Sequence, residues 1–231
     1  MPKLETRKEQ LLAFVVREYS RTAEPVASDV LRDKYGMDIS PATIRSEMAA
    51  LEKAGYLKQP HTSAGRVPTE EGYRYYIENC VEATNIENDL RGLKHILQGE
   101  EGYHEAKMKR LAKELAGQLS EGVFISFAPQ ATYYTGLSYL FDQPEFENVD
   151  LVRQIGDIVD NLDQVIAGMF TALTPGMRVY VGSENPFGVG CSTILFKPSE
   201  QALLGVLGPM RMDYDKAIGL MRGLERLMVN N

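Results

Sequence analysis

Residues 40–69 read SPATIRSEMAALEKAGYLKQPHTSAGRVPT, and this stretch decides the fold of the first part of the chain. Ser40 is a favoured helix N-cap, and Pro41 suits the first helical position because its missing N–H needs no partner there. Gly55 suits the end of this helix. The apolar residues that follow Pro41 recur at helical spacing, so they predict an amphipathic helix whose inward side carries Ile44, Met48 and Leu51.

The chain before this stretch predicts two more short helices, at residues 7–20 and 27–35. Thr6 and Glu9 have the spacing of a capping box, in which each side chain bonds the other residue's backbone N–H. Gly36 suits the left-handed stop that ends the second helix. On that helix, the residues predicted to point inward are Val30 and Leu31.

A β-ribbon is predicted after the third helix. Residues 56–60 and 66–68 are short and strand-like, and residues 61–65 between them are rich in turn formers. Three short helices followed by a ribbon is the layout of a winged helix-turn-helix domain, in which the third helix enters the major groove of DNA. Residues 1–80 are therefore predicted to form a winged-helix DNA-binding domain.

The side of the third helix opposite its apolar stripe is the predicted DNA-reading face. Small residues there let the backbone approach the groove closely, while Arg45 can make a bidentate bond to guanine and Ser46 can contact either type of base. Thr43 and the helix N-terminus are placed to meet phosphate. The residues of this helix predicted to contact DNA are Ser40, Ala42, Thr43, Arg45, Ser46, Ala49 and Lys53.

The ribbon supplies the second set of predicted DNA contacts. Its cationic side chains surround a tight loop whose hydroxyl groups can donate hydrogen bonds to phosphate. The residues of this wing predicted to contact DNA are Lys58, His61, Thr62, Ser63 and Arg66. Two alternatives stay open: the ribbon as a solvated hairpin, and the third helix as an amphipathic helix of a domain that never touches DNA.

Charge is distributed unevenly along the chain, whose net charge is −7. Residues 1–68 carry 11 Lys and Arg against 9 Asp and Glu, a net charge of +2, whereas residues 69–231 carry 14 against 23, a net charge of −9. A sequence-specific DNA-binding domain needs a basic face rather than a basic protein. The charge is therefore compatible with DNA binding but does not predict it.

Several other classes of protein have no support in the sequence. The two cysteines, Cys80 and Cys191, lie far apart, which suits a reducing cytoplasm and gives no disulfide framework. The histidines are scattered, and no metal spacing, catalytic motif or Gly-rich phosphate loop is present. No apolar run approaches the roughly 18 residues of a membrane span. The expectation is a cytoplasmic protein that is not an enzyme and has no cofactor or metal.

The rest of the chain predicts an α+β arrangement. Residues 86–119 read as helical, and residues 81–120 are predicted to be a helical linker and dimerisation region. Residues 121–231 are predicted to form the second domain. Its expected elements are a strand at 123–128, a helix within 142–170, three strands at 178–182, 192–196 and 203–207, and a closing helix that starts at Asp213.

Several motifs are similar to those of a known family. In the first domain they are EPV at 24–26, SPATIRSEM at 40–48, the longer LEKAGYLKQPHTSAGRVPT at 51–69, and GYR at 72–74. In the last third of the chain they are GLS at 136–138, PEF at 144–146, GSEN at 182–185 and GVLGPMRMDY at 205–214. By these motifs the sequence resembles the heat-inducible transcription repressors of the HrcA family.

The resemblance implies a dimeric repressor of chaperone operons that binds double-stranded DNA at an inverted-repeat operator. It also implies a second domain similar to a GAF-type sheet domain, and a link between activity and a GroEL-type chaperonin. The chain departs from the family pattern between Phe127 and Thr135, where members have a long block and this sequence has only a few residues. The second domain is therefore expected to be a reduced GAF-like antiparallel sheet domain.

Together these features predict a sequence-specific repressor of heat-shock genes that binds DNA through its winged helix-turn-helix domain. The repressor is expected to be a homodimer held by the C-terminal part of the chain. The acidic net charge and the shortened second domain motivate an alternative. In that alternative the chain is a protein-interaction or ligand-sensing module that has a winged helix but binds no operator.

Overall fold

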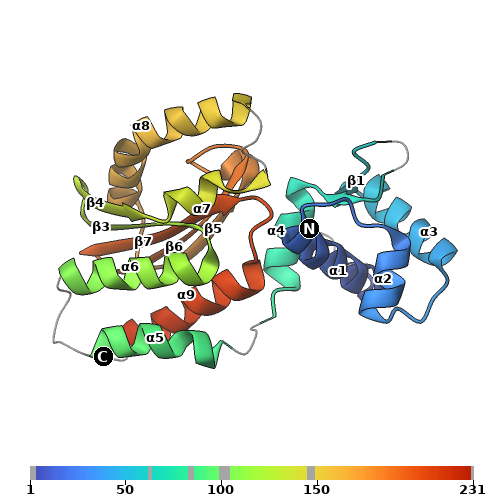
Figure 1. Cartoon of the computed structure of the whole chain (residues 1–231), viewed down its shortest axis with the longest axis horizontal. Helices are drawn as coiled ribbons and strands as arrows, with labels where there is room; N and C mark the ends of the chain where they lie inside the picture. The colour runs from blue at the N-terminus through green and yellow to red at the C-terminus, as the bar shows by residue number, and fades with distance from the viewer. Residues whose placement is uncertain (1–3, 62–63, 83–85, 99–104, 145–148, 230–231) are drawn as a thin grey trace. The chain divides into compact units, whose positions relative to one another are not determined.

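The chain forms two compact units, Met1–Val81 and Glu82–Asn231 (Figure 1). The computed structural model describes residues 4–61, 64–82, 86–98, 105–144 and 149–229, with the backbone alone for residues 149–160 and 229. The first unit consists of helices and a two-stranded ribbon, whereas the second unit is built around a five-stranded sheet.

The first unit is a winged helix-turn-helix domain, as the sequence predicts. Three helices precede a short antiparallel ribbon, and a fourth helix follows it. The first helix packs against each of the other three. The elements are α1 (Thr6–Thr22), α2 (Ser28–Tyr35), α3 (Pro41–Lys53), β1 (Leu57–Lys58), β2 (Val67–Pro68) and α4 (Glu70–Asn79).

Most side chains predicted to point inward do so. The apolar stripe of α3 is buried, which confirms the predicted face of that helix. On α2, Leu31 is completely buried, but Val30 is 37% exposed, so the prediction that Val30 points inward was wrong. Consecutive residues of a helix are about 100° apart around its axis, so this short helix can turn only one of the two fully toward the interior.

The start of α1 also differs from the prediction. Its N-cap is Glu5, whose side chain makes no capping bond, so Thr6 and Glu9 do not form a capping box. The carboxylate of Glu9 instead accepts a hydrogen bond from the hydroxyl of Tyr75 in α4, with 2.7 Å between the two oxygens. A contact between distant segments therefore replaces the expected local one.

A buried carboxylate joins α1 to α2. Glu18 is 5% exposed and accepts hydrogen bonds from Lys34, from Arg21 at 2.7 Å and from the Tyr35 hydroxyl at 3.0 Å. Burial by itself raises the pKa of Glu18, but the hydrogen bonds from Lys34, Arg21 and Tyr35 outweigh it and hold the pKa below its ordinary value. Ionised Glu18 therefore stabilises the first unit.

Replacing Glu18 with glutamine is expected to lower the free energy of unfolding by about 1.5–3 kcal/mol at neutral pH, because hydrogen bonds to a charged group are lost. The folded-state pKa is depressed, so the contribution of Glu18 is fully present above the unfolded pKa and is lost as the pH falls through the folded pKa. Urea unfolding of the two proteins should show a difference that narrows below about pH 4.5, the ordinary value. A difference that stays constant into strong acid would contradict this role.

The second unit holds an antiparallel sheet with the strand order β4, β3, β7, β6, β5. This sheet confirms the predicted α+β class and is consistent with a GAF-like domain. β4 was not predicted from the sequence, whereas the other strands were. The strands are β3 (Gly122–Ala128), β4 (Ala131–Thr135), β5 (Gly176–Val181), β6 (Cys191–Ser199) and β7 (Ala202–Pro209).

A short turn stands where members of the family have a long block, as the shortened sequence predicts. Ala128 pairs with Ala131, so only Pro129 and Gln130 connect β3 to β4. The two strands pair from this turn back to Val123 and Thr135. The shortened chain therefore closes into a hairpin, whose pairing has one irregularity between Ser126 and Ala128.

Helices cover both faces of the sheet (Figure 1). The helices of this unit are α5 (Glu87–Gln98), α6 (Glu105–Leu119), α7 (Leu137–Phe141), α8 (Val149–Ala172) and α9 (Tyr214–Val229). α7 and α8 cover one face, and α6 and α9 cover the other, with α5 packed outside α6 and α9. α5 and α6, which fall in the segment predicted as a linker, thus pack within the second unit.

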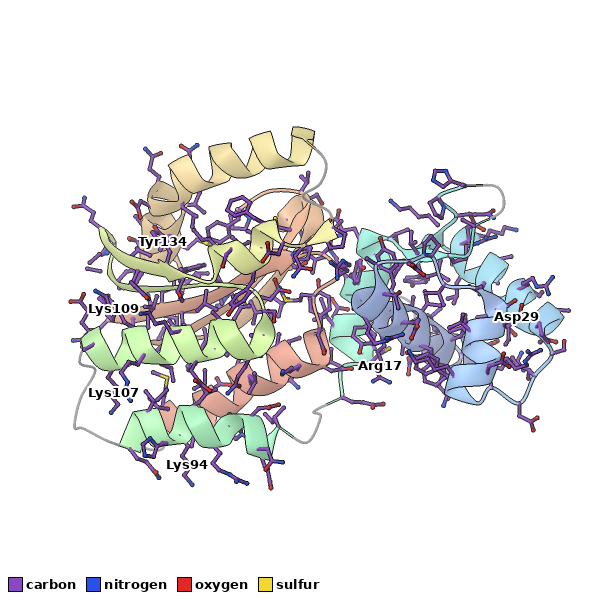
Figure 2. All side chains as sticks on the ribbon, in the orientation of Figure 1. Arg17, Asp29, Lys94, Lys107, Lys109 and Tyr134 are labelled. Carbon is purple, nitrogen blue, oxygen red and sulfur yellow. The ribbon has the colours of Figure 1, made fainter. Side chains whose placement is uncertain are left out.

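Polar contacts fix α8 on the sheet above an apolar interior. Lys197 of β6 is 2% exposed, and its ammonium donates to the carbonyls of Phe170 at 2.9 Å and Leu173 at 2.7 Å, at the C-terminal end of α8. A cation is favoured at that end by the helix dipole. Nearer the middle of α8, Asp163 accepts a hydrogen bond from Tyr134 of β4, whose position Figure 2 shows.

Candidate nucleic-acid interface

The helix-turn-helix is fixed by local signals in the sequence. Gly36 follows α2 in the left-handed conformation, with φ of 62°, and its N–H donates to the carbonyl of Arg32 at 3.1 Å. Ser40 caps α3, since its hydroxyl oxygen accepts from the backbone N–H of Thr43 at 3.1 Å, and Pro41 occupies the first turn. The predicted start of the third helix is therefore confirmed.

The structure brings most of the predicted reading residues to one exposed side of α3. Thr43 is half-buried, and its hydroxyl lies 2.9 Å from that of Ser40, which is itself exposed. Because most of this side consists of alanine and serine, nothing bulky keeps another molecule from the helix backbone. The exposed reading residues along the helix are Ala42, Arg45, Ser46, Ala49 and Lys53.

Arg45 is the one large side chain in the middle of this face, and α2 orients it. Its Nε donates to the hydroxyl of Ser28, a buried residue in the first turn of α2, at 3.2 Å. Among the described residues the two terminal amino groups of Arg45 have no hydrogen-bond partner, so they remain able to bind. Sequence reasoning missed Ser28, because only the packing of α2 on α3 brings it to Arg45.

The wing is a short ribbon tied back to the segment before α2. Leu57 pairs with Pro68 and Lys58 with Val67. Beyond that register, the N–H and carbonyl groups of Arg66 and Val26 exchange two hydrogen bonds of 2.9 Å. A side chain at Gly65 would place its Cβ 2.3 Å from the Val26 carbonyl oxygen, so glycine is needed where the two backbones approach.

The predicted wing residues are not equally free to bind DNA. Lys58 and His61 are exposed, whereas Arg66 is half-buried and forms an ion pair of 2.9 Å with Glu52 of α3. Thr62 and Ser63 lie outside the described residues. Sequence reasoning missed Glu52, because Glu52 and Arg66 are 14 positions apart and meet only when the ribbon folds back on α3.

A hollow of about 310 Å³ lies where α2, α3 and the wing meet. Arg45 enters it from α3 and Arg66 from the wing, and the side-chain amide of Gln59 donates to the Ala64 carbonyl at 3.0 Å on its rim. Two guanidinium groups around one hollow favour a negatively charged occupant. The full lining is Val26, Ala27, Ser28, Arg45, Met48, Gln59, Ala64, Gly65 and Arg66.

Ion pairing distinguishes three cations of α3 and the wing from most other cations of the first unit. Within the described part of the unit, Arg45, Lys53 and Lys58 have no carboxylate within ion-pair distance. All three belong to α3 or the wing. The cations that pair with a carboxylate are Arg7, Lys8, Arg21, Arg32, Lys34, Arg66 and Arg74. Among the described residues, α3 and the wing thus carry three positive charges that no carboxylate offsets.

Other kinds of site find little support. Among the residues that the structure describes, no three or more His, Cys, Asp or Glu side chains gather in a way that could hold a metal ion. None of the described helices has the length and apolar character needed to cross a membrane.

Three helices, a ribbon and an exposed cationic helix face define a transcription regulator of the winged-helix class. Residues 72–218 match the family model described as the HrcA protein C-terminal domain, which is more than half of the chain. The chain therefore belongs to the HrcA family of heat-inducible transcription repressors.

Curated relatives agree with this assignment. A heat-inducible transcription repressor HrcA of Desulforamulus reducens is 26% identical, over 97% of this chain and 96% of the relative. The repressor HrcA of Desulforudis audaxviator is 47% identical over 118 residues, which cover 50% of this chain and 33% of the relative. The first alignment has 332 positions against 231 residues in this chain, so at least 101 positions belong to the relative alone. The chain is therefore a shortened member within the aligned span.

One solved structure has the same fold. It is described as the crystal structure of a hypothetical protein, and it matches with a TM-score of 0.77 over 99% of this chain and 98% of its own. The two sequences are 17% identical, so the likeness shows the fold alone.

Proposed function

We propose that this protein represses transcription of heat-shock genes by binding double-stranded DNA through α3 and the wing. The observation that carries the proposal is a group of three cations, Arg45, Lys53 and Lys58, around a helix face of small residues. None of the three pairs with a carboxylate in the described part of the chain. Electrostatic attraction to phosphate supplies much of the affinity for DNA, and side chains in the major groove supply specificity. A repressor of this kind must reach its operator, so its proposed location is the cytoplasm.

Each part of the face has a distinct role in this proposal. Arg45 reads a base edge, with Ser46 beside it and Ala42 and Ala49 allowing close approach. Ser40 and Thr43, at the start of α3, meet phosphate, as does Lys53 at its end. The proposed wing contacts to the DNA backbone are Lys58, His61, Thr62, Ser63 and Arg66. Because Arg66 already has Glu52 as a partner, we expect it to contribute less than Lys58.

Replacing Lys58 with alanine is expected to weaken binding to every DNA sequence by a similar factor, because a phosphate contact carries no sequence information. The slope of the logarithm of affinity against the logarithm of salt concentration should fall by about 0.9. Fluorescence anisotropy over a salt series measures the affinity and its salt dependence. Lys113→Ala, at an exposed lysine of α6, is the control. Loss of affinity for one sequence alone would contradict a backbone role.

We also propose that the protein acts as a homodimer on an inverted-repeat operator. A single face with three uncompensated cations binds DNA weakly, whereas two linked faces add their contacts and fix the spacing of the half-sites. Light scattering after size exclusion should give twice the chain mass of 25.8 kDa. A monomer at micromolar concentration would exclude this assembly. A GroEL-type chaperonin stays part of the proposal because the family resemblance implies one.

The acidic net charge and the Arg66–Glu52 pair favour a second candidate, a winged-helix interaction or ligand-sensing module without operator binding. Gel shifts with DNA from upstream of chaperone genes separate the two functions. Saturable binding with a steep salt dependence supports the repressor. No binding at low salt supports the interaction module instead.

A further inference from the structure

A groove of about 730 Å³ runs between α5 and α9 on the outside of the second unit. The α5 residues that line it fall at positions i, i+3, i+4, i+7, i+10 and i+11, so they form one continuous side of that helix. They extend from Glu87 to Gln98, the first and last residues of α5, a length of about 18 Å. A groove of this length fits a helical segment better than a small molecule. Its lining is Glu87, Leu90, Arg91, Lys94, Leu97, Gln98, Gly223, Arg226 and Leu227.

The floor of the groove is apolar. Leu90 sits against Gly223, where an added Cβ would lie 2.5 Å from the Leu90 side chain, so α5 and α9 approach closely at this point. Leu90, Leu97 and Leu227 remain only half-buried in the described structure. An apolar strip between two helices is the surface that an amphipathic helix covers when it binds in a groove.

The rim of the groove is basic. Arg91, Lys94 and Arg226 are exposed, and within the described residues none of them has a carboxylate partner; Arg91 donates only to the side chain of Asn88, at 2.8 Å. Figure 2 shows Lys94 on the side of α5 that faces away from the sheet. Of the lining residues that the structure describes, Glu87 alone is acidic.

This positive rim stands out because its surroundings are acidic. Residues 82–231 carry 13 Lys and Arg against 20 Asp and Glu, a net charge of −7, whereas the groove lining has a net charge of +2. A reversal of sign at an apolar groove gives electrostatic complementarity to a negatively charged partner.

We infer that this groove binds an acidic amphipathic helix of another protein. The apolar side of that helix covers Leu90, Leu97 and Leu227, and its carboxylates pair with Arg91, Lys94 and Arg226. A second copy of this chain does not fit, because a twofold contact through this face would oppose two surfaces of charge +2. Nucleic acid fits less well, because neither its phosphates nor its polar base edges would find a partner in the leucine floor of the groove.

The test uses the full chain and a labelled synthetic helix of about 18 residues, with leucines along one side and glutamates elsewhere. The expected result is saturable binding that Lys94→Glu and Arg226→Glu each weaken about tenfold. Lys113→Glu, an exposed lysine of α6 outside the groove, should leave it unchanged. A peptide of the same composition with its leucines spread around the helix should bind much less. Circular dichroism of each variant checks that the surface changes leave the fold intact.

The inference would be overturned by no binding of the acidic helix at low salt, or by binding that Lys94→Glu leaves unchanged. Loss of self-association in Lys94→Glu would also overturn it and would assign the groove to a second copy. Operator binding is measured in parallel and should be the same in Lys94→Glu as in the wild type. Loss of operator binding in Lys94→Glu but not in Lys113→Glu would overturn the inference and assign the groove to DNA.

Discussion

Replacing Leu31 with alanine is expected to cost the winged-helix unit about 2–5 kcal/mol of unfolding free energy. Leu31 is 0% exposed on α2, a helix of eight residues that packs against α1 and α3. Truncating its side chain leaves a cavity. Because the helix is short, it has few other contacts that could offset the lost packing. Since a domain of this size has about 5–15 kcal/mol in total, the loss is expected to reduce operator binding through unfolding.

The neighbouring residue supplies the control. Val30→Ala removes a side chain of similar size from the same helix at a site that is 37% exposed, so its cost should be well below that of Leu31→Ala. Thermal unfolding followed by circular dichroism compares the two variants. The second unit is unchanged in both, so its unfolding serves as the reference. Equal destabilisation by the two substitutions would contradict the described orientation of α2.

Arg45→Ala is expected to weaken operator binding by about 1–3 kcal/mol and to relax the preference for a single base position. Arg45 is exposed on α3, and the buried hydroxyl of Ser28 holds its Nε, while its terminal amino groups bond no other described residue. Its removal costs the hydrogen bond to Ser28 but creates no cavity, so stability should fall by no more than about 0.5–1.5 kcal/mol. The loss therefore falls on recognition rather than on folding.

Binding curves with the operator and with operators altered at one position measure this effect. Arg32→Ala is the matched control, since Arg32 is an exposed arginine of α2 already paired with Asp33. Unchanged operator binding by Arg45→Ala would remove Arg45 from the reading face. A uniform loss over all DNA sequences would make Arg45 a phosphate contact instead.

Local signals made the helix-turn-helix predictable. Ser40, Pro41 and Gly36 act within one or two turns of their own position, so the ends of α2 and α3 follow from the sequence. The apolar spacing of α3 settled its buried side, and the exposed side followed by exclusion. The second unit's central strands were predictable for a similar reason, because each is a run of apolar residues buried on both faces.

Contacts between distant segments were not predictable. Glu9 has the right spacing for a capping box, yet it bonds Tyr75, 66 positions later. Arg66 reads as a free cation until the fold brings Glu52 beside it. β4 was missed because its five residues show no alternation of burial and pair only with β3, across a short turn.

Selection of bound double-stranded DNA from a random pool by the full chain tests the central claim most directly. The account predicts enrichment of one inverted repeat, with half-site centres about 34–36 Å or a multiple of that apart. Arg45→Ala should lose the preference at one position in each half-site. A pool that shows no enriched sequence after repeated rounds at low salt would contradict sequence-specific DNA binding by this protein.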